Sequence, residues 1–377
     1  MFESVPFWMY AVGFLLVLGP LVTVHELGHY LVGRFFGVHA EAFSVGFGKE
    51  IIGFNDRSGT RWKLSALPLG GYVQFKGDMN PASVPDGQVV HEPGSFQSAA
   101  LWKRALIVAA GPVTNLVVAV AIFAAFFAIL GKPVPVDPEG STKVGGFSET
   151  SAAQEAGVEV GDQIIAIDGE PVANFGEILD KVAIYLDRDI AVTVLRDGEE
   201  RTFEFRTNLV ETKDKFGNIN RIGQMGVSPA AGAYKFEPVG LGSSVVLAGE
   251  QTWRVFDLMV TGIKQVVTGE RSIKELGGPV KIAKYSGEQL SSGPLAFFNF
   301  AALISLNLAF INFLPIPALD GGHLAFYAAE AIRRKPVGPR ATEWAYRTGI
   351  ALVLVFMVVV TFNDVTSLPL FGNLLDS

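Results

Sequence analysis

The chain of 377 residues contains no cysteine and only five histidines. Without cysteine it can form neither a disulfide nor a thiolate nucleophile. The cysteine content therefore does not indicate whether the protein faces an oxidising or a reducing compartment. Charged residues are also scarce, at 18% of the chain against 49% hydrophobic residues. The net charge is −7, and residues 132–290 alone hold 17 Lys/Arg and 24 Asp/Glu. A mildly acidic chain lacks the basic face that nucleic acid requires, so no nucleic-acid partner is expected.

Four long runs contain no charged residue at all: residues 5–24, 105–131, 289–319 and 348–363. The first three reach the roughly 17–25 residues that a membrane-spanning helix needs. The fourth is slightly short, but Trp344, Tyr346 and Arg347 beside it suit a membrane interface. The first run lacks the basic start and the small-residue cleavage site of a signal peptide, so we expect a retained helix. About four transmembrane helices are therefore predicted.

Basic residues are distributed unevenly between the connecting segments. Residues 34–104 contain eight Lys/Arg, and residues 333–347 contain five, whereas the tails 1–6 and 348–377 contain none. Because short cytoplasmic loops carry the excess of Lys and Arg, residues 34–104 and 325–347 are predicted to be cytoplasmic. Both termini and the long region 132–290 then lie on the outer side.

Glycine-rich strands are predicted inside the first cytoplasmic segment. The stretches FSVGFGKEIIGF and TRWKLSALPLGGYVQFKGD alternate apolar positions between turn residues, as short strands do. Two interpretations remain open. The strands form either a hairpin that dips back beside the first helix, where protein or a wet cavity shields it, or a small sheet on the surface.

Residues 142–230 are predicted to form a compact module. The stretch AGVEVGDQIIAIDGEPV resembles a PDZ domain of the bacterial membrane-protease type, and such domains bind extended peptide ends by adding a strand to a sheet. Helical spacing follows in FGEILDKVAIYL, and Asp197-Gly198 predicts a tight hairpin. Residues 239–265 have amphipathic helical spacing. This helix is expected either on the outer membrane surface or packed against the module.

The first uncharged run leads directly into the pattern His-Glu-Leu-Gly-His at residues 25–29. His25 and His29 are four residues apart, so they stack on one helix face and can reach a single metal ion. Glu26 lies about 100° further round, where it can act on water at the metal without being a ligand. This spacing is typical of zinc hydrolases. Simple polar pairing inside the bundle is the structural alternative, but ionisable residues within a membrane are functional by default.

A catalytic zinc takes three protein ligands and leaves one position open. The third uncharged run ends in NFLPIPALDGGH, residues 312–323, in which Pro315 and Pro317 interrupt the helix. Interrupted helices at membrane depth line cavities, and this segment ends on the same side of the membrane as the first motif. We predict Asp320 as the third ligand of one zinc per chain. His323 is the rival ligand, and helix capping is the structural alternative for Asp320.

Three motifs together resemble the site-2 protease family of intramembrane zinc metalloproteases: HELGH, AAGPVTN (residues 109–115) and NFLPIPALDGG. The stretches FSVGFG and LPLGGYV are similar to its re-entrant β-region, and the likeness is greatest to the bacterial regulator of sigma-E protease branch. The resemblance implies that His25, His29 and Asp320 bind zinc, that Glu26 is the catalytic base and that Asn312 holds substrate. Only one PDZ-like segment is present, whereas the best-known members have two, which leaves substrate gating open.

The resemblance also implies the setting of the reaction. The protein is expected in the bacterial inner membrane, among its lipids, with the termini and the PDZ domain periplasmic and the active site near the cytoplasmic side. Expected substrates are single-pass membrane proteins already trimmed outside, such as an anti-sigma factor, or remnant signal peptides. A substrate helix must unwind before cleavage, and the hairpin residues Leu69, Gly70, Gly71 and Tyr72 are predicted to offer a strand edge to the opened segment.

The predicted fold class is a multi-pass α-helical membrane protein of about four helices, with a membrane-associated β-hairpin region and one inserted α+β PDZ domain. Along the chain we expect a first helix with the zinc motif (1–34), the β-region (35–102), a second helix (103–131), the PDZ domain (142–230), an amphipathic linker region (236–288), a third helix (289–324), a cytoplasmic loop (325–342), a fourth helix (343–364) and a tail (365–377).

Two other function classes remain as alternatives. A metal transporter can use the same His and Asp ligands, but it needs neither Glu26 nor a PDZ module. A catalytically silent PDZ adaptor is disfavoured because the HELGH pattern is intact. No G-x-S-G or G-x-G-D sequence occurs, so serine and aspartate intramembrane proteases of those types are excluded.

Overall fold

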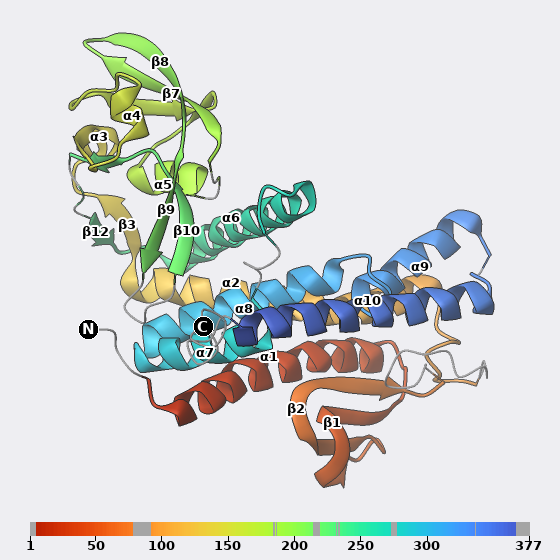
Figure 1. Ribbon diagram of the computed structural model, residues 1–377. Helices are drawn as coiled ribbons and strands as arrows, with labels where there is room; N and C mark the ends of the chain where they lie inside the picture. Colours follow the sequence, from red (N-terminus) through yellow and green to blue (C-terminus); the bar gives the residue numbers. More distant parts are fainter. Residues whose placement is uncertain are drawn as a thin grey trace, which may run out of the picture. The chain divides into compact units, whose positions relative to one another are not determined.

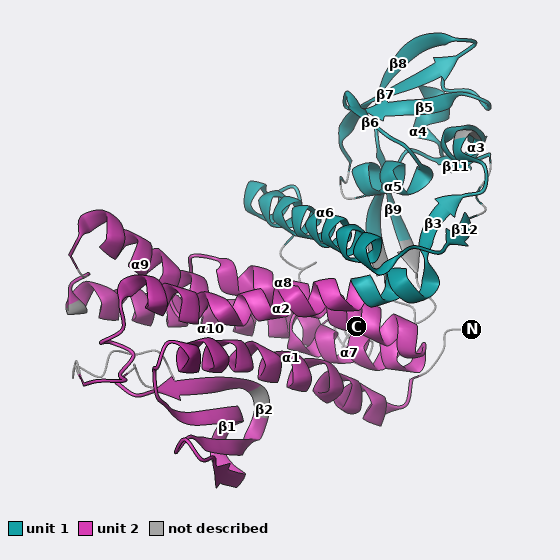
Figure 2. Ribbon diagram, turned by 180° about the vertical axis from the view of Figure 1, so that it is seen from behind, with its two compact units in different colours: residues 1–4, 124–272 teal, residues 5–123, 273–377 magenta. Residues whose placement is uncertain are grey.

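The computed structural model describes residues 5–77, 92–183, 185, 187–213, 219–230, 232, 234–272, 277–335 and 337–366. The chain divides into two compact units (Figure 2). One unit comprises residues 1–4 and 124–272, and the other comprises residues 5–123 and 273–377. The predicted tail from residue 367 onward lies outside the described residues.

Four helices of the described chain are long and apolar enough to cross a membrane, as predicted. Their bounds are α1 Phe7–Phe35, α2 Leu101–Leu130, α8 Pro294–Phe313 and α10 Pro339–Thr366. The fourth is longer than its 16-residue uncharged run, because helical structure continues through the charged residues that precede the run. Length and composition therefore support an integral membrane protein.

A short helix, α7 (Pro279–Ser291), packs closely on the first half of α1. A Cβ atom added at Gly13 would lie 2.7 Å from the carbonyl carbon of Ser286, and one added at Gly287 would lie 2.8 Å from the backbone nitrogen of Tyr10. Small residues allow such close contact between membrane helices. The end expected for the amphipathic linker, residue 288, thus falls inside a helix of the bundle.

The start of α7 is tied to α10 by a buried carboxylate. Asp364 is fully buried and accepts hydrogen bonds from the backbone N–H groups of Gly278 and Lys281, each at 3.0 Å from Oδ2. The first N–H groups of a helix have no partner within the helix, so this carboxylate satisfies them and interacts favourably with the helix dipole.

A bent β-sheet accompanies the second half of α1 (Figure 1). Its strands are β1 (Ala40–Asn55) and β2 (Arg61–Phe75), which pair antiparallel. Val45 lies opposite both Gly71 and Leu64, so the first part of β1 has a neighbour on each side. The prediction of short strands is wrong in length. Glycines with positive φ, Gly46 and Gly70 among them, bend these strands without ending them.

The turn between β1 and β2 is anchored to α1 through Asp56. Its carboxylate accepts hydrogen bonds from the Trp62 indole at 3.1 Å and from the Tyr30 hydroxyl at 3.0 Å. The Trp62 bond, aided by bonds from the backbone N–H groups of Thr60 and Ser58, lowers the pKa of Asp56 to about 2. Arg34 completes the contact by donating to the Tyr30 hydroxyl. The sheet is therefore attached to the helix that carries the HELGH motif.

The other unit contains a four-stranded antiparallel sheet in the order β6-β5-β7-β8. Its strands are β5 Gln163–Ile167, β6 Glu170–Pro171, β7 Asp189–Arg196 and β8 Glu199–Arg206. Asp197 and Gly198 both have positive φ in the β7–β8 turn, which confirms the predicted tight hairpin. Helices α4 (Ala152–Glu155) and α5 (Phe175–Ala183) accompany the sheet, and Ile164, Ile178 and Val194 form part of its core.

Three two-stranded pairs and two helices complete this unit. The pairs are β3 (Lys132–Pro135) with β12 (Tyr234–Glu237), β4 (Val144–Phe147) with β11 (Val227–Pro229) and β9 (Asn208–Lys213) with β10 (Ile219–Gln224). The helices are α3 (Pro138–Thr142) and α6 (Leu241–Thr268), the latter over the predicted amphipathic segment. The Trp253 side chain on α6 is 71% exposed, and Arg254 pairs with Asp180 of α5 at 3.2 Å.

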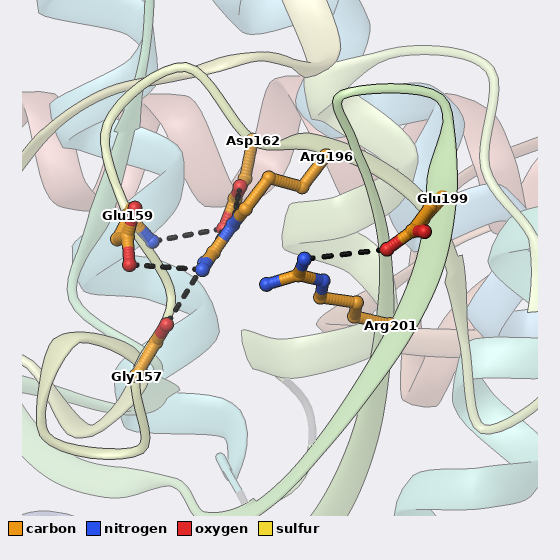
Figure 3. A network of polar contacts seen from close by, with 6 residues as sticks. All are labelled: Gly157, Glu159, Asp162, Arg196, Glu199 and Arg201. Atoms are coloured by element: carbon orange, nitrogen blue, oxygen red, sulfur yellow. Dashed lines mark hydrogen bonds and ion pairs between the residues drawn. The ribbon is translucent and has the colours of Figure 1, made fainter.

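A buried arginine–carboxylate pair fixes the loop before β5 (Figure 3). Arg196, at the end of β7, donates to both carboxylate oxygens of Asp162 at 2.6 Å, and it also bonds Glu159 and the carbonyl of Gly157. Burial by itself would raise the pKa of Asp162, but the hydrogen bonds from Arg196 lower it overall. The pair thus holds residues 157–162 against the sheet in a bidentate geometry.

Candidate metal centre and catalytic site

Two glycines allow α1 and α2 to meet at the HELGH motif. A Cβ atom added at Gly28 would lie 2.6 Å from the carbonyl oxygen of Ala110. One added at Gly111 would lie 2.2 Å from Nε2 of His29 and 2.7 Å from Nε2 of His25. Real Cβ atoms cannot approach so closely, so Gly111 leaves the space in which the two imidazoles converge.

Three potential ligand atoms converge beside Gly111. Nε2 of His25 lies 3.2 Å from Nε2 of His29 and 3.2 Å from Oδ2 of Asp320, and His29 Nε2 lies 3.7 Å from that oxygen. Ligand atoms bound tetrahedrally at zinc distances are separated by about 3.4 Å. The observed separations bracket this value, and all three groups are shielded from solvent. These residues therefore fit a zinc ion in both chemistry and spacing.

Asp320 reaches the two histidines because the chain breaks between two helices. Helix α8 ends at Phe313 and α9 (Asp320–Arg333) begins at Asp320, on either side of the Pro315 and Pro317 segment. The helix break predicted from the prolines is confirmed. Gly321 and Gly322 permit the tight turn, because a Cβ at either position would collide with backbone of residues 313–317. Asp320 consequently stands at the start of a helix and points back to α1.

Helix α2 supplies hydrogen-bond partners for both imidazoles. Nδ1 of His29 lies 2.8 Å from the carbonyl oxygen of Ile107. A carbonyl can only accept, so Nδ1 carries the proton and the lone pair of Nε2 is directed at the other ligand atoms. Nδ1 of His25 lies 3.2 Å from the side-chain nitrogen of Asn115. Such outer contacts fix the orientation of metal-binding histidines.

Glu26 lies in the same cavity as the three potential ligands. This cavity has a volume of about 390 Å³. The Glu26 carboxylate accepts a hydrogen bond from the backbone N–H of Val73 and interacts electrostatically with His25, His29 and Asp320. The close approach of β2 depends on Gly71, whose added Cβ would lie 3.1 Å from Cγ of Glu26. The β-region thus positions the carboxylate next to the convergent ligand atoms.

The residues predicted to hold substrate also border this cavity. Gly70, Gly71 and Tyr72 line it from β2, and Asn312 lines it from the end of α8. Residues 71–75 pair with β1 along one edge, and the same segment borders the cavity. The backbone of Leu69 belongs to β2, but its side chain lies outside the described part of the structure.

His323, the rival ligand, lies at the rim of the convergent group. It lines the cavity, but its Nδ1 forms a 2.6 Å hydrogen bond with the hydroxyl of Tyr346 on α10. Within the described residues, the group of mutually close ligand atoms contains Asp320 and leaves His323 out. The geometry therefore favours Asp320 as the third ligand.

Sequence reasoning missed four contributors to the site: Ile107, Gly111, Asn115 and Tyr346. The AAGPVTN stretch carried a signal, since an asparagine and a glycine stand there within an apolar run. The sequence did not show which residue each of them contacts, because those contacts join α2 and α10 to positions more than 20 residues away.

A bundle of apolar helices with two histidines, a glutamate and an aspartate around one buried cavity defines a membrane metalloprotease. The chain belongs to peptidase family M50, whose model matches residues 13–356. It is 43% identical to a protein of Agrobacterium fabrum over 95% of this chain and 96% of that one, and 42% identical to one of Rhizobium meliloti over 93% and 95%. Both are named as zinc metalloproteases. It is also 32% identical to the metalloprotease MmpA of Caulobacter vibrioides, over 97% of each chain.

These findings establish the enzyme class and the cofactor. The protein is a zinc metalloprotease, and it is an integral membrane protein. As a membrane protease it acts on membrane protein substrates, and lipid surrounds its apolar helices. The predicted membership of the site-2 protease family is confirmed.

Adding one methyl group at Gly111 should empty the zinc site. In Gly111→Ala the new Cβ occupies the space between the two imidazoles, so the affinity for zinc should fall by more than the roughly 100-fold that loss of an outer contact causes, enough to leave the purified protein largely without zinc. Zinc content of the purified full-length protein in detergent measures this. The matched control is Gly19→Ala on α1, where nothing lies within 4 Å of the added atom. Equal zinc content in the two variants would contradict the close-packing argument.

Proposed function

We propose that this protein is an intramembrane endopeptidase that cuts the membrane-spanning segments of single-pass proteins. The depth of the candidate catalytic group carries the proposal. His29 and His25 precede the end of α1 by six and ten residues, which at 1.5 Å per residue is roughly 9–15 Å along the helix. Because the uncharged run 5–24 leads directly into His25, a reaction centre on this part of α1 acts on bonds near one face of the bilayer. Charge distribution supports the cytoplasmic face.

In the proposed reaction His25, His29 and Asp320 hold the zinc, and Glu26 transfers protons. Zinc, when bound, supplies a Lewis acid that activates water and polarises the scissile carbonyl. The Glu26 carboxylate accepts the proton from the attacking water and returns it to the leaving amide nitrogen. The Val73 N–H donates to this carboxylate, which keeps it oriented between the zinc site and the strand. Peptide-bond hydrolysis then needs no covalent enzyme intermediate.

We further propose that β2 and Asn312 hold the substrate in an extended form. A peptide bond within a helix is shielded by the hydrogen bonds of that helix, so the substrate segment must unwind first. Residues 70–75 border the cavity and can pair with the opened backbone, replacing the hydrogen bonds that unwinding breaks. Asn312 carries an amide that can donate to and accept from the same backbone.

The module at residues 142–230 is proposed to be a PDZ domain that filters substrates. Its four-stranded sheet, the α5 helix and the motif before β5 support that assignment. With the module and both termini on the periplasmic side of an inner membrane, a bulky outer domain would be excluded, and trimmed proteins would be admitted. Anti-sigma factors already cut outside, and remnant signal peptides, satisfy this requirement. The protease would then act in regulated intramembrane proteolysis.

The ligand and base roles predict different losses. We expect His25→Ala, His29→Ala and Asp320→Ala each to lose zinc and cleavage together. Glu26→Gln should keep zinc but lower the cleavage rate by at least about 100-fold, because only the proton transfer is removed. Zinc content and cleavage of a single-pass substrate, measured on the same purified preparations, separate the two classes. Full cleavage by Glu26→Gln, or zinc retained in Asp320→Ala, would refute the assignment of that residue.

The strand-holding role predicts dependence on substrate helicity. Asn312→Ala and Tyr72→Pro should slow the cleavage of a leucine-rich substrate severely while zinc content stays normal. Substrates with a Gly-Pro pair beside the scissile bond should lose less, since they unwind without help. The ratio of kcat/KM between the two substrates is the measurement. If both substrates lose equally, these residues have another role.

The filter role predicts a gain of function on removal of the module. The backbone N–H of Ala230 lies 2.8 Å from the carbonyl oxygen of Lys143, so the ends of the module are adjacent and a short linker can replace residues 144–229. We expect this deletion to allow cleavage of a substrate whose outer domain is intact, with trimmed substrate cut at the normal rate. Cleavage of trimmed substrate alone would exclude the filter.

A further inference from the structure

Asn115 is a buried polar residue, and only one of the two polar groups of its side-chain amide has a hydrogen-bond partner among the described residues. It lies on α2, is completely buried and borders the cavity of the site. Its side-chain nitrogen faces Nδ1 of His25 at 3.2 Å. Its side-chain oxygen has no hydrogen-bond partner among the residues that the structure describes. An unpaired buried carbonyl is destabilising, so this arrangement requires an explanation.

The chemistry of zinc binding resolves the mismatch. A neutral imidazole that binds zinc through Nε2 must carry its proton on Nδ1. In His25 that proton would then point at the amide nitrogen of Asn115, where donor would face donor. Rotating the Asn115 amide by about 180° exchanges its oxygen and nitrogen, which have nearly the same shape. The oxygen then accepts from Nδ1 of His25, and the unpaired carbonyl disappears.

We propose that Asn115 is a positioning residue that holds His25 in the zinc-binding tautomer through its side-chain oxygen. The inference deepens the proposed function, because it rests on His25 being a zinc ligand. Zinc binding through Nε2 leaves the proton of neutral His25 on Nδ1, and the side-chain oxygen of Asn115 accepts it across the 3.2 Å that separates the two groups.

The surroundings of Asn115 hold this residue in place. Its backbone carbonyl accepts a 2.8 Å hydrogen bond from the hydroxyl of Ser305 on α8, which fixes this point of α2 against the helix that leads to Asp320. His29 has a comparable partner in the Ile107 carbonyl, which accepts in one direction only. The two imidazoles are therefore oriented by the same helix, one by a backbone carbonyl and the other by a side-chain amide.

Substitutions at Asn115 distinguish an acceptor from a donor. Asn115→Leu keeps the volume and removes both groups, so the dissociation constant for zinc should rise by about 10–100-fold. Asn115→Asp keeps an acceptor and loses the donor, so its zinc affinity should stay within about threefold of the unsubstituted protein. Competition for zinc with a fluorescent chelator measures both on the full-length protein in detergent. The matched control is Val117→Leu, two residues further along α2, whose side chain is 58% exposed, and it should leave zinc affinity unchanged.

Several outcomes would overturn the inference. Unchanged affinity in Asn115→Leu would exclude a positioning role, and equal losses in the Asp and Leu variants would mean that the amide donates or merely packs. If the Leu variant does not fold, Asn115→Ala takes its place, because it too removes both polar groups, and unchanged zinc affinity in that variant would equally exclude the positioning role. Zinc retained by His25→Ala would instead refute the proposed set of zinc ligands. The error would then lie in that set and not in the positioning role of Asn115.

Discussion

The contact between α1 and α2 is the constraint on which the rest of the site depends. Gly28 and Gly111 let the two helices approach until backbone meets backbone, and only at that separation can the Ile107 carbonyl and the Asn115 amide reach the two imidazoles. The same approach leaves a space bordered by two nitrogens and one carboxylate oxygen. A methyl group in that space would separate the ligand atoms, so the close packing of α1 and α2 is itself a requirement for metal binding.

Each remaining element brings a group to this contact from a different direction. The break after α8 delivers Asp320, and the two glycines that follow it allow the turn to close. The bent β-sheet delivers the Val73 N–H and the cavity-lining edge of β2, and Asp56 fastens that sheet to α1. Helix α7 packs on the first half of α1, and Asp364 of α10 accepts hydrogen bonds from the start of α7. The reaction centre is thus surrounded by elements that are separately anchored, which favours the fixed geometry that catalysis needs.

Membership of peptidase family M50 gives these contacts a chemical purpose. A zinc protease within a membrane must keep its polar groups paired in an environment that supplies little water. The structure does this by giving both predicted histidine ligands an oriented partner on α2 and by placing the glutamate against a backbone N–H. The proposed strand edge follows the same rule, since an unwound substrate also needs partners for its backbone.

The sequence by itself determined the local features of this protein. Uncharged runs predicted the four apolar helices, Pro315 and Pro317 predicted the break, Asp197-Gly198 predicted the hairpin, and the spacing of His25 and His29 predicted their common face. These features depend on neighbours a few residues away, so the pattern contains them. Only the tertiary structure placed Asp320, and not His323, in one group with both histidines, extended and bent the β-strands, and revealed Asn115 and Gly111. The residues around the two histidines depend on the distance between helices remote in the chain, which the packing of small residues sets. The strand lengths depend on the pairing of β1 with β2. No local periodicity encodes either.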